Sequence, residues 1–476
     1  MKSAAAKSYP PAPASPKAAA PASLGRASLV GYALPGVPAA MMLYAVGVIV
    51  PGFYASDVGL SATVVGTVLL LTRLVDVGFE FAVGYLSDRT RSSAGRRKPW
   101  VVAGAIVIAV GFYTLMTPEP GAPWQRFFFS SLAFYLGWAM LIVPYDAWGS
   151  ELAHDYASRA TIFTSRATAA YIGSLLFSLI PILPLFASSE FSPEVMRFAA
   201  FAVAVGLAVA IPIAFTFVPA EPAAPPKPAT LKGLLQALLK NAPLRLYMVS
   251  AILCGLSNGI FAAVTYIYQT DYMGFASRVW LMLIVYLAAN LIALPVWTAV
   301  VRRIGKHKAW AMGLLLNSLC FPPMAYLAPG EASFIPTLAL LGLAGATYSI
   351  VNVTMPAVLG DVVDHETLRS GTNRAGGFFA FQALITKLTL AVGAGAAFLV
   401  IGYFGFNTGT LRQTPDGVFG IQLAYLYLPA ALNLTCIFFL WRFPLDQHAM
   451  SVIRRRLSAL AARQSGYTQM PLDEAG

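Results

Sequence analysis

The sequence predicts an all-α membrane protein in which twelve transmembrane helices form two pseudo-symmetric six-helix bundles. Of its 476 residues, 58% are hydrophobic and only 11% are charged, and the mean hydropathy is +0.69. Soluble domains usually carry about 25% charged residues. Twelve apolar stretches approach the roughly 20 residues that a helix needs to cross a bilayer, and the second six repeat features of the first.

The predicted helices follow one another with short polar connections. They cover residues 29–54, 61–87, 99–117, 125–150, 160–187, 196–218, 244–271, 278–301, 308–327, 333–358, 374–402 and 418–441. We predict a disordered cytoplasmic tail (1–26), an N-terminal bundle (27–219), a cytoplasmic linker (220–243), a C-terminal bundle (244–442) and a second cytoplasmic tail (443–476). The first tail is rich in Ala, Pro, Ser and Lys and has no apolar core of a signal peptide. In the linker, Leu231–Lys240 looks amphipathic and could lie on the membrane surface.

Basic residues are concentrated in alternate connections. Arg96-Arg97-Lys98 and Arg302-Arg303 lie in basic connections, whereas Asp57 and Glu190 lie in the short acidic ones. The positive-inside rule therefore places the basic connections and both termini in the cytoplasm. This distribution explains the net charge of +12 without a nucleic-acid partner. We expect a multi-pass protein of a plasma membrane, the inner membrane of a bacterium.

Several classes of function lack their sequence signals. The chain has no Gly-x-x-x-x-Gly-Lys-Ser/Thr sequence for a nucleotide, no zinc spacing and no nucleophile elbow, so we expect neither an enzyme nor a cofactor. The three cysteines, Cys254, Cys320 and Cys436, lie in apolar segments and are interpreted as packing residues. The expected partners are membrane lipid and a small solute, and we expect a monomer whose energy source is an ion gradient.

The two halves of the chain are related by a shift of about 210 residues. The shift aligns Gly95–Trp100 with Gly305–Trp310, and it also aligns Glu151 with Asp361 and Arg159 with Arg369. The same shift thus aligns two separate loops with their counterparts, which indicates an internal repeat. Two six-helix halves in parallel repeat describe the major facilitator architecture, in which the solute site lies near mid-membrane between the halves.

Three ionisable residues lie inside the second predicted helix. Arg73, Asp76 and Glu80 are spaced three and four apart and therefore share one helix face. Each costs about 3 kcal/mol at the centre of a bilayer even on mild scales, so they need a polar interior, each other or a cation. The 210-residue shift aligns them with Leu283, Tyr286 and Asn290, and this asymmetry favours a function for the carboxylates.

Asp76 and Glu80 are the predicted coupling site for a cation. Two carboxylates at this spacing repel each other when both are ionised, and a proton or small cation relieves the repulsion. Arg73 and Lys387 are candidates for charge balance, since Lys387 lies roughly 18 Å into its helix, too deep to reach the surface easily. The alternative is that these residues only join helices through structural salt bridges.

Further polar and aromatic residues are candidates for contact with solute or for gating. The tentative solute-binding residues are Tyr145, Asp146, Trp148, Arg166, Asn258 and Asn352. Packing, helix–helix hydrogen bonds or a salt bridge between Arg166 and the acids of the fourth helix are the alternatives for them. The candidates for a cytoplasmic gate made of charge pairs are Asp88, Arg89, Arg97, Glu151, Arg159, Asp361, Asp364 and Arg369.

These motifs, in this order, resemble a known transporter family. Arg73-x-x-Asp76-x-x-x-Glu80, the loop ending Arg97-Lys98-Pro99-Trp100, Val143-Pro144-Tyr145 and Gly360-Asp361-Val-Val-Asp364 with Lys387 are similar to the glycoside–pentoside–hexuronide:cation symporters, the melibiose permease group. The resemblance implies uptake of a sugar or glycoside with Na⁺, Li⁺ or H⁺. It also implies that Asp76 and Glu80 bind the cation and that Lys387 is the family's lysine of the eleventh helix.

Two departures from the family pattern affect the expected specificity. The sugar-binding carboxylates of the melibiose-type members would fall at Ala40 and Ile142, and the polar cation ligands at Phe79 and Ala139. With fewer oxygens available, the site suits H⁺ better than Na⁺, although Na⁺ at Asp76 and Glu80 stays open. We therefore predict H⁺-coupled symport of a sugar, glycoside or related solute by alternating access. The alternatives are a transporter of an amphiphilic lipid or drug-like solute, and a sensor that does not transport.

Overall fold

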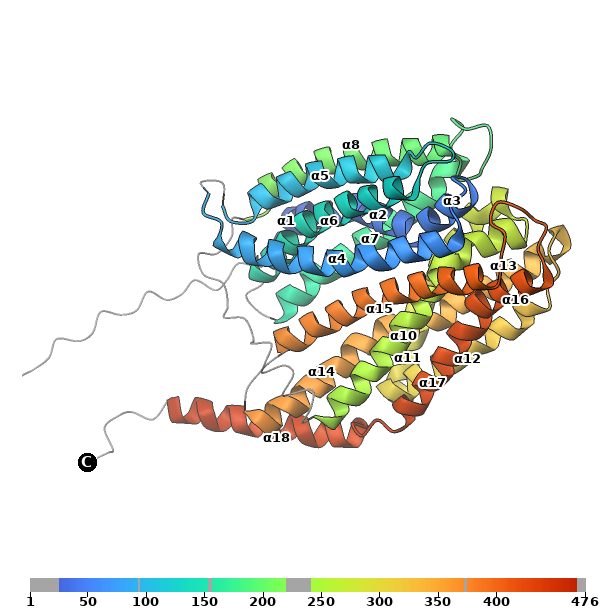
Figure 1. Cartoon of the computed structure of the whole chain (residues 1–476). Coiled ribbons are helices and arrows are strands. Elements are labelled where there is room, and N and C mark those ends of the chain that lie inside the picture. The colour runs from blue at the N-terminus through green and yellow to red at the C-terminus, as the bar shows by residue number, and fades with distance from the viewer. Residues whose placement is uncertain (1–24, 93–94, 153–155, 220–240, 372–374, 469–476) are drawn as a thin grey trace, which may run out of the picture.

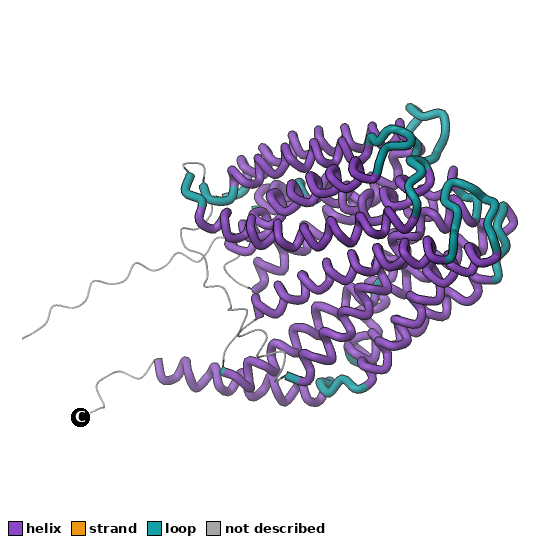
Figure 2. The backbone as a smooth tube through the Cα atoms, viewed as in Figure 1, coloured by secondary structure: helices purple, strands orange, loops and turns teal. Residues whose placement is uncertain are grey.

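A computed structural model describes residues 25–92, 95–152, 156–219, 241–371 and 375–468. In this part of the chain, helices form two bundles that lie side by side (Figures 1 and 2). Among the described residues, eleven helical spans are long and apolar enough to cross a membrane. A further helix, α12 (Lys306–Ala325), packs against the spans that follow it and corresponds to the predicted segment 308–327. The expected all-helical, twelve-helix fold is confirmed.

The described part of the N-terminal half contains eight α-helices, which make six spans. They are α1 (Arg26–Ala33), α2 (Gly36–Tyr44), α3 (Val50–Ser56), α4 (Ala62–Arg89), α5 (Lys98–Met116), α6 (Trp124–Leu152), α7 (Tyr156–Leu179) and α8 (Pro193–Phe217). The first span changes to a wider π-helical turn over Ala45–Ile49, just before Pro51. Proline lacks an N–H and displaces the carbonyl four residues earlier, so the α-helical pattern changes there.

The C-terminal half repeats this arrangement. Besides α12 it contains α10 (Ala242–Ile267), α11 (Val279–Ile304), α13 (Phe334–Tyr348), α14 (Ile350–Ser370), α15 (Ala375–Tyr403), α16 (Pro415–Gln422) and α17 (Leu428–Trp441). Polar caps define several helix starts, as expected for Ser, Thr and Asn side chains. Ser61 accepts a hydrogen bond from the Val64 N–H, and Asn241 accepts one from the Leu244 N–H.

One boundary and one additional helix differ from the sequence prediction. The tenth span continues to Ser370, beyond the predicted end at residue 358, because Asp361 and Glu366 are buried with cationic or amide partners. The tail also contains a helix, α18 (Gln447–Thr468), which the sequence analysis does not predict. The first 24 residues and the predicted linker helix Leu231–Lys240 lie outside the described residues.

The two ends of the bundle differ in charge. We call the end that carries Arg97, Lys306 and α18 the basic side, and the opposite end, with Asp57 and Asp271, the acidic side. In Figure 1 the halves diverge toward the basic side. Toward the acidic side they pack closely, because glycines let backbones approach. A Cβ added to Gly66 of α4 would lie 2.8 Å from the Gly395 carbonyl oxygen of α15.

Candidate functional site

The charged residues of α4 form a cluster that crosses the interface between the halves. Glu80 of α4 makes an ion pair with Lys387 of α15. On α4 itself, Arg73 Nη1 lies 3.4 Å from Asp76 Oδ2. The cluster thus contains two carboxylates and two fixed cations, and its formal charges cancel. The structure brings together all four residues for which the sequence predicts coupling or charge balance.

Asp76 is the most buried member of the cluster. Only 4% of the residue is exposed, and its Oδ1 atom accepts no hydrogen bond from any described residue. Its partner Arg73 is held in place from the other side, since the guanidinium lies 4.2 Å from the centre of the Tyr135 ring on α6. A cation over an aromatic face is favourable. Asp76 therefore has one oxygen paired and one free to receive a proton or cation.

A central cavity lies beside this cluster and between the halves. It has a volume of about 260 Å³ and is lined by residues of both halves, including Arg73 and Tyr135 from the N-terminal half and Gly259 and Leu390 from the C-terminal half. Ala40, where the family resemblance would place a sugar-binding carboxylate, also lines it. Most of the lining is apolar, so the polar groups that border it are few.

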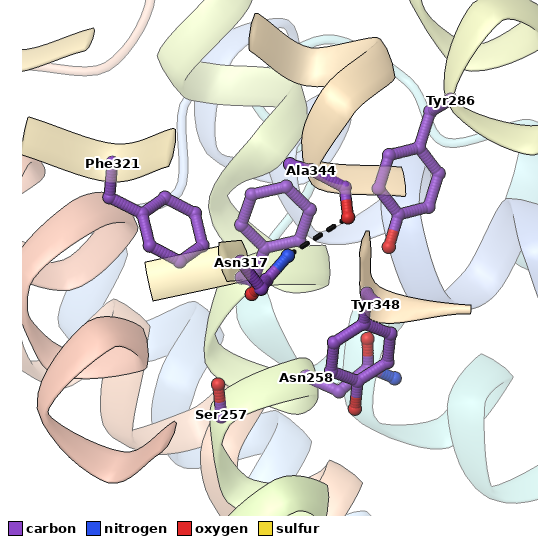
Figure 3. A pocket seen from close by; sticks show the side chains of 8 residues that line it. Ser257, Asn258, Tyr286, Asn317, Phe321, Ala344 and Tyr348 are labelled. Carbon is purple, nitrogen blue, oxygen red and sulfur yellow. Dashed lines mark hydrogen bonds between the residues drawn. The ribbon is translucent and has the colours of Figure 1, made fainter. Parts of the chain in front are cut away.

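The cavity continues into a second lobe that lies against the C-terminal half. This lobe, of about 210 Å³, shares Tyr44, Val48 and Ala262 with the first and is bordered by Asn258 and Tyr286. Asn258 also borders a small cavity of about 10 Å³ (Figure 3), room for a single water. Asn258, a predicted solute-binding residue, therefore lies at the cavity wall.

Asn352, another predicted solute-binding residue, takes part in a hydrogen-bonded ring across the halves. Its Nδ2 donates to the Tyr171 hydroxyl of α7 and to Asn290 Oδ1 of α11, both at 3.3 Å. The Tyr171 hydroxyl donates to Asn290 Oδ1 at 3.2 Å. We call Tyr171, Asn290 and Asn352 the polar triad. Sequence reasoning missed Tyr171, because a tyrosine in an apolar helix carries no signal of its partner.

The two aromatic residues among the solute-binding candidates are packed within the N-terminal half. Tyr145 is 2% exposed and stacks on Tyr32 with ring centres 4.6 Å apart. Trp148 is fully buried, and its indole N–H donates to the Pro219 carbonyl at 3.2 Å. In this conformation neither ring faces the cavity. Both rings are packed against other side chains, as in the alternative to solute contact given above. Burial of aromatic rings against one another explains the arrangement.

The other pair of candidates on α6 and α7 forms a salt bridge. Asp146 and Arg166 are directly paired, with part of each side chain exposed. The Arg166 guanidinium also lies 5.5 Å from the centre of the Tyr145 ring. The expected reach of Arg166 to the acids of the fourth helix is thus present. Whether either residue contacts solute stays a prediction.

On the basic side, the candidate gate residues of the N-terminal half pair within that half. Arg97 is buried and lies 2.7 Å from Asp88, and its Nη1 donates to Ser87 Oγ at 3.1 Å. The Arg89 guanidinium covers the ring of Tyr85 at 3.7 Å. Glu151 lies in α6 and Arg159 in α7, but their side chains are outside the part that the structure describes.

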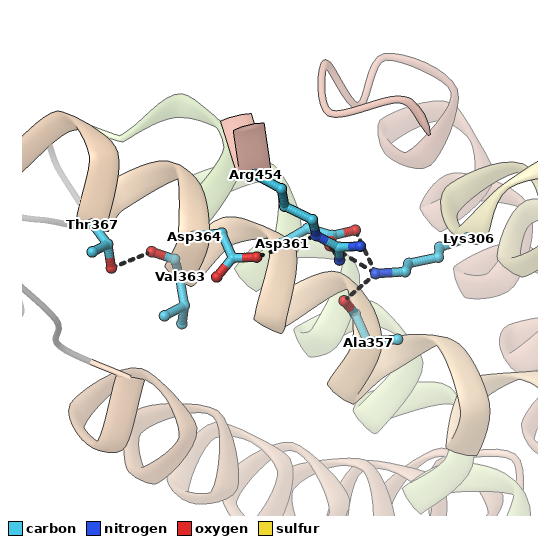
Figure 4. Close-up of polar contacts among 7 residues, drawn as sticks. All are labelled: Lys306, Ala357, Asp361, Val363, Asp364, Thr367 and Arg454. Carbon is cyan, nitrogen blue, oxygen red and sulfur yellow. Dashed lines mark hydrogen bonds and ion pairs between the residues drawn. The ribbon is translucent and has the colours of Figure 1, made fainter. Parts of the chain in front are cut away.

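The matching residues of the C-terminal half hold the tail helix (Figure 4). Asp361 accepts from Lys306 Nζ at 2.7 Å and from Arg454 of α18 at 3.0 Å. Arg454 also lies 3.6 Å from Asp364, and Arg369 lies 3.4 Å from Glu366. The sequence did not predict that the tail supplies the partner of Asp361 and Asp364. The spacing of Met450, Ile453 and Leu457, apolar residues that α18 turns toward the core, was the signal for it.

The halves are joined on the acidic side by a buried carboxylate. Asp271, which is 7% exposed, accepts hydrogen bonds from Ser56 Oγ of the first span at 2.6 Å and from the Gly409 N–H at 2.7 Å. Thr408 Oγ1 donates to the Ala55 carbonyl at 2.8 Å. We call this set the acidic-side contact. It links the N-terminal half to the connection between α15 and α16.

Asp57, which follows Ser56 of this contact, should make the stability of the fold depend on pH. Partial burial, with the nearby charges of Asp271 and Glu190, raises the pKa of Asp57 from 3.8 to about 6. A raised carboxyl pKa favours the protonated form in the folded chain. The contribution of Asp57 to stability is therefore complete below about pH 4 and is lost as the pH rises through about 6.

We expect Asp57→Asn to remove this pH dependence. Near about pH 4 the midpoint of thermal unfolding in detergent should be close to that of the wild type. As the pH rises to about 7, the midpoint of the variant should exceed that of the wild type by a growing difference. Glu119→Gln, which removes a different exposed carboxylate of the same side, is the control. An advantage of Asp57→Asn that stays constant over this range would contradict the assignment.

Comparisons with known proteins agree with the fold. The structure superposes on the nucleoside transporter NupG with a TM-score of 0.61 and 14% identity, covering 88% of this chain and 99% of that one. It also superposes on a bacterial homologue of the human lysosomal transporter Spinster with a TM-score of 0.61 and 11% identity, covering 88% and 98%. The chain therefore shares its fold with these two transporters.

Sequence comparisons identify the family. Residues 31–447 match the family described as MFS/sugar transport protein, and the chain belongs to that family. It is 23% identical to the glucuronide carrier protein homolog of Escherichia coli, over 88% of this chain and 92% of the relative. It is 24% identical to the isoprimeverose transporter of Lactiplantibacillus pentosus, over 79% and 80%. These matches confirm the resemblance to the glycoside–pentoside–hexuronide:cation symporters.

Proposed function

We propose that this protein is a secondary active transporter that carries a sugar, glycoside or related hydroxylated solute together with a proton. The observation that carries the proposal is the ion pair between Glu80 and Lys387, which joins the two halves beside the central cavity. The relatives named as a glucuronide carrier, a putative glycoside/cation symporter and an isoprimeverose transporter support a carbohydrate as the solute.

The ion pair connects the charge state of the cluster to the relative position of the halves. While Glu80 is ionised, Lys387 holds α15 against α4. A proton on Glu80 removes the charge that attracts Lys387, so the two helices can separate there. Asp76, with its free Oδ1, is the second group that a proton can reach. Cation entry therefore changes which conformation is favoured, and such a difference is what coupling requires.

The composition of the cluster favours a proton over Na⁺. Arg73 and Lys387 already supply a cation to each carboxylate. Phe79 and Ala139 offer no side-chain oxygen to complete a shell around a metal ion. A proton needs only one oxygen, whereas Na⁺ would have to find several while two fixed cations repel it.

Addition of solute to an unbuffered suspension of cells that produce the protein tests the ion. With isoprimeverose or a simple glucuronide, we expect the medium to become more alkaline both with and without Na⁺, since protons enter with the solute. Uptake that requires Na⁺ and leaves the pH unchanged would contradict proton coupling. A thermal-shift screen of sugars, glycosides and lysolipids, run beforehand on purified protein, selects the solute.

The apolar lining of the cavity favours a second candidate solute class. Leu69, Leu390 and Ala391 line the larger lobe along with Ala40. A solute with an apolar part, such as an amphiphilic lipid or a drug-like molecule, would contact these residues favourably. Stabilisation by lysolipids and by none of the sugars in the same screen would select this candidate.

The proposal includes an orientation in the membrane. The basic side, with Arg97, Lys306 and Arg454, belongs in the cytoplasm by the positive-inside rule. The acidic-side contact would then close the cavity toward the outside. We propose that the protein is a monomer with both termini in the cytoplasm.

A further inference from the structure

The polar triad uses all of the hydrogen-bonding groups that its side chains turn toward one another. An amide nitrogen has two hydrogens, and an amide oxygen has two lone pairs. Both hydrogens of Asn352 Nδ2 and both lone pairs of Asn290 Oδ1 are taken up within the ring. The Tyr171 hydroxyl both donates and accepts there. A solute hydroxyl that binds Asn352 Nδ2 or Asn290 Oδ1 therefore replaces a bond of the ring.

The triad lies one helical turn from the cavity, on the basic side of it. Tyr286, four residues before Asn290 on α11, borders the second lobe. Tyr348 borders the small cavity, four residues before Asn352. Both α11 and α14 run toward the basic side, so their triad residues lie farther in that direction than the cavity wall. On α7, Ser174 borders the larger lobe, three residues past Tyr171.

The internal repeat relates the triad to the charged cluster. The 210-residue shift aligns Glu80 with Asn290. Glu80 of α4 reaches across to Lys387 of the C-terminal half, and Asn290 of α11 reaches across to Tyr171 of the N-terminal half. The two contacts thus hold the halves together at corresponding depths along two different pairs of helices. One contact is charged and the other is neutral.

We propose that the polar triad is a solute-operated inner gate, which a hydroxylated solute opens by taking over the hydrogen bonds among Tyr171, Asn290 and Asn352. This inference rests on the proposed transport function. Protonation releases the bond between Glu80 and Lys387, but it does not change the charge of an amide or of a phenol. Separation of the halves on the basic side then requires the proton at one contact and the solute at the other. Neither ligand alone releases both.

The gate can be tested without knowing the solute. Ser174→Cys places a thiol in the cavity wall, at a residue whose hydroxyl bonds only to the Ala170 carbonyl of its own helix. The native cysteines Cys254, Cys320 and Cys436 are buried, so the unsubstituted chain serves as the blank. In inside-out vesicles without solute, a membrane-impermeant maleimide should label the new thiol slowly while the triad is intact.

Tyr171→Phe removes one hydrogen-bond donor and one acceptor from the polar triad and keeps the aromatic side chain. We expect it to raise the labelling rate roughly tenfold, the effect of losing one or two neutral hydrogen bonds. Thr168→Val is the matched control, since it removes an exposed hydroxyl of α7 that bonds only to Thr164 of its own helix. Asn352→Ala, at an exposed residue, is a second variant that should act in the same direction.

Labelling at the parent rate in both Tyr171→Phe and Asn352→Ala would overturn the gate. So would an equal increase in Thr168→Val, since loosening of α7 would then explain the result. The labelling assay does not depend on transport. If labelling rises as expected but no carbohydrate is transported, the gate stands and the proposed solute class fails.

Discussion

Asp76→Asn and Glu80→Gln should each abolish accumulation of solute against its gradient while leaving the chain folded. Each substitution keeps the size of the side chain and removes the group that takes up the proton. Glu80→Gln also removes the charge that holds Lys387, so the link between protonation and the position of the halves is lost. Uptake into proteoliposomes with an imposed proton gradient should reach the external concentration of solute and stop there.

Solute exchange separates this result from a simple loss of the protein. Counterflow of labelled solute needs the cavity and the movement of the halves but no gradient, so both variants should retain it. Glu331→Gln is the matched control, because it removes a carboxylate from the exposed pair with Arg278, a kind of pair that contributes about 0–1 kcal/mol. Full accumulation in both cluster variants would show that the coupling site lies elsewhere.

Gly137→Ala should strongly destabilise the N-terminal half. The backbones of α5 and α6 approach closely at this residue, and an added Cβ would clash with the backbone nitrogen of Ile108. Because the clash is with backbone, no side-chain rotation relieves it, and the helices must move apart. Overpacking costs about 1–3 kcal/mol even where side chains can adjust, so we expect a loss at or above the top of this range.

The measurement is the thermal unfolding of purified protein in detergent, together with the yield of monodisperse protein. Both should fall in Gly137→Ala. Gly78→Ala is the matched control, since a Cβ added at Gly78 of α4 meets nothing within 4 Å. An unfolding midpoint for Gly137→Ala as high as that of Gly78→Ala would mean that α5 and α6 do not pack at this distance.

The sequence predicted the features of this protein that depend on single helices or on the repeat. Spacing alone placed Arg73 and Asp76 on one face of α4, and depth in the helix singled out Lys387. The repeat predicted the two halves and the interface between them. The sequence predicted less well which residue is the partner of another across that interface, because helix rotation and tilt decide which side chains meet.

Tyr145 and Tyr171 illustrate the difference. Both are tyrosines in apolar helices. Sequence reasoning proposed the first as a tentative solute contact, with packing as the alternative, and did not consider the second. The structure stacks Tyr145 on Tyr32 inside one half and joins Tyr171 to the other half. The direction in which a tyrosine points depends on the packing of whole helices. No local pattern distinguishes the two.

The attachment of α18 has a mechanical consequence. Arg454, about two turns into a helix of 22 residues, is fixed to Asp361 and Asp364 of the C-terminal half. At 1.5 Å per residue the whole helix is about 33 Å long, and about half of it extends beyond Leu457, which still packs against the C-terminal half. A rotation of the C-terminal half therefore displaces the far end of α18 by a larger distance than it displaces Arg454.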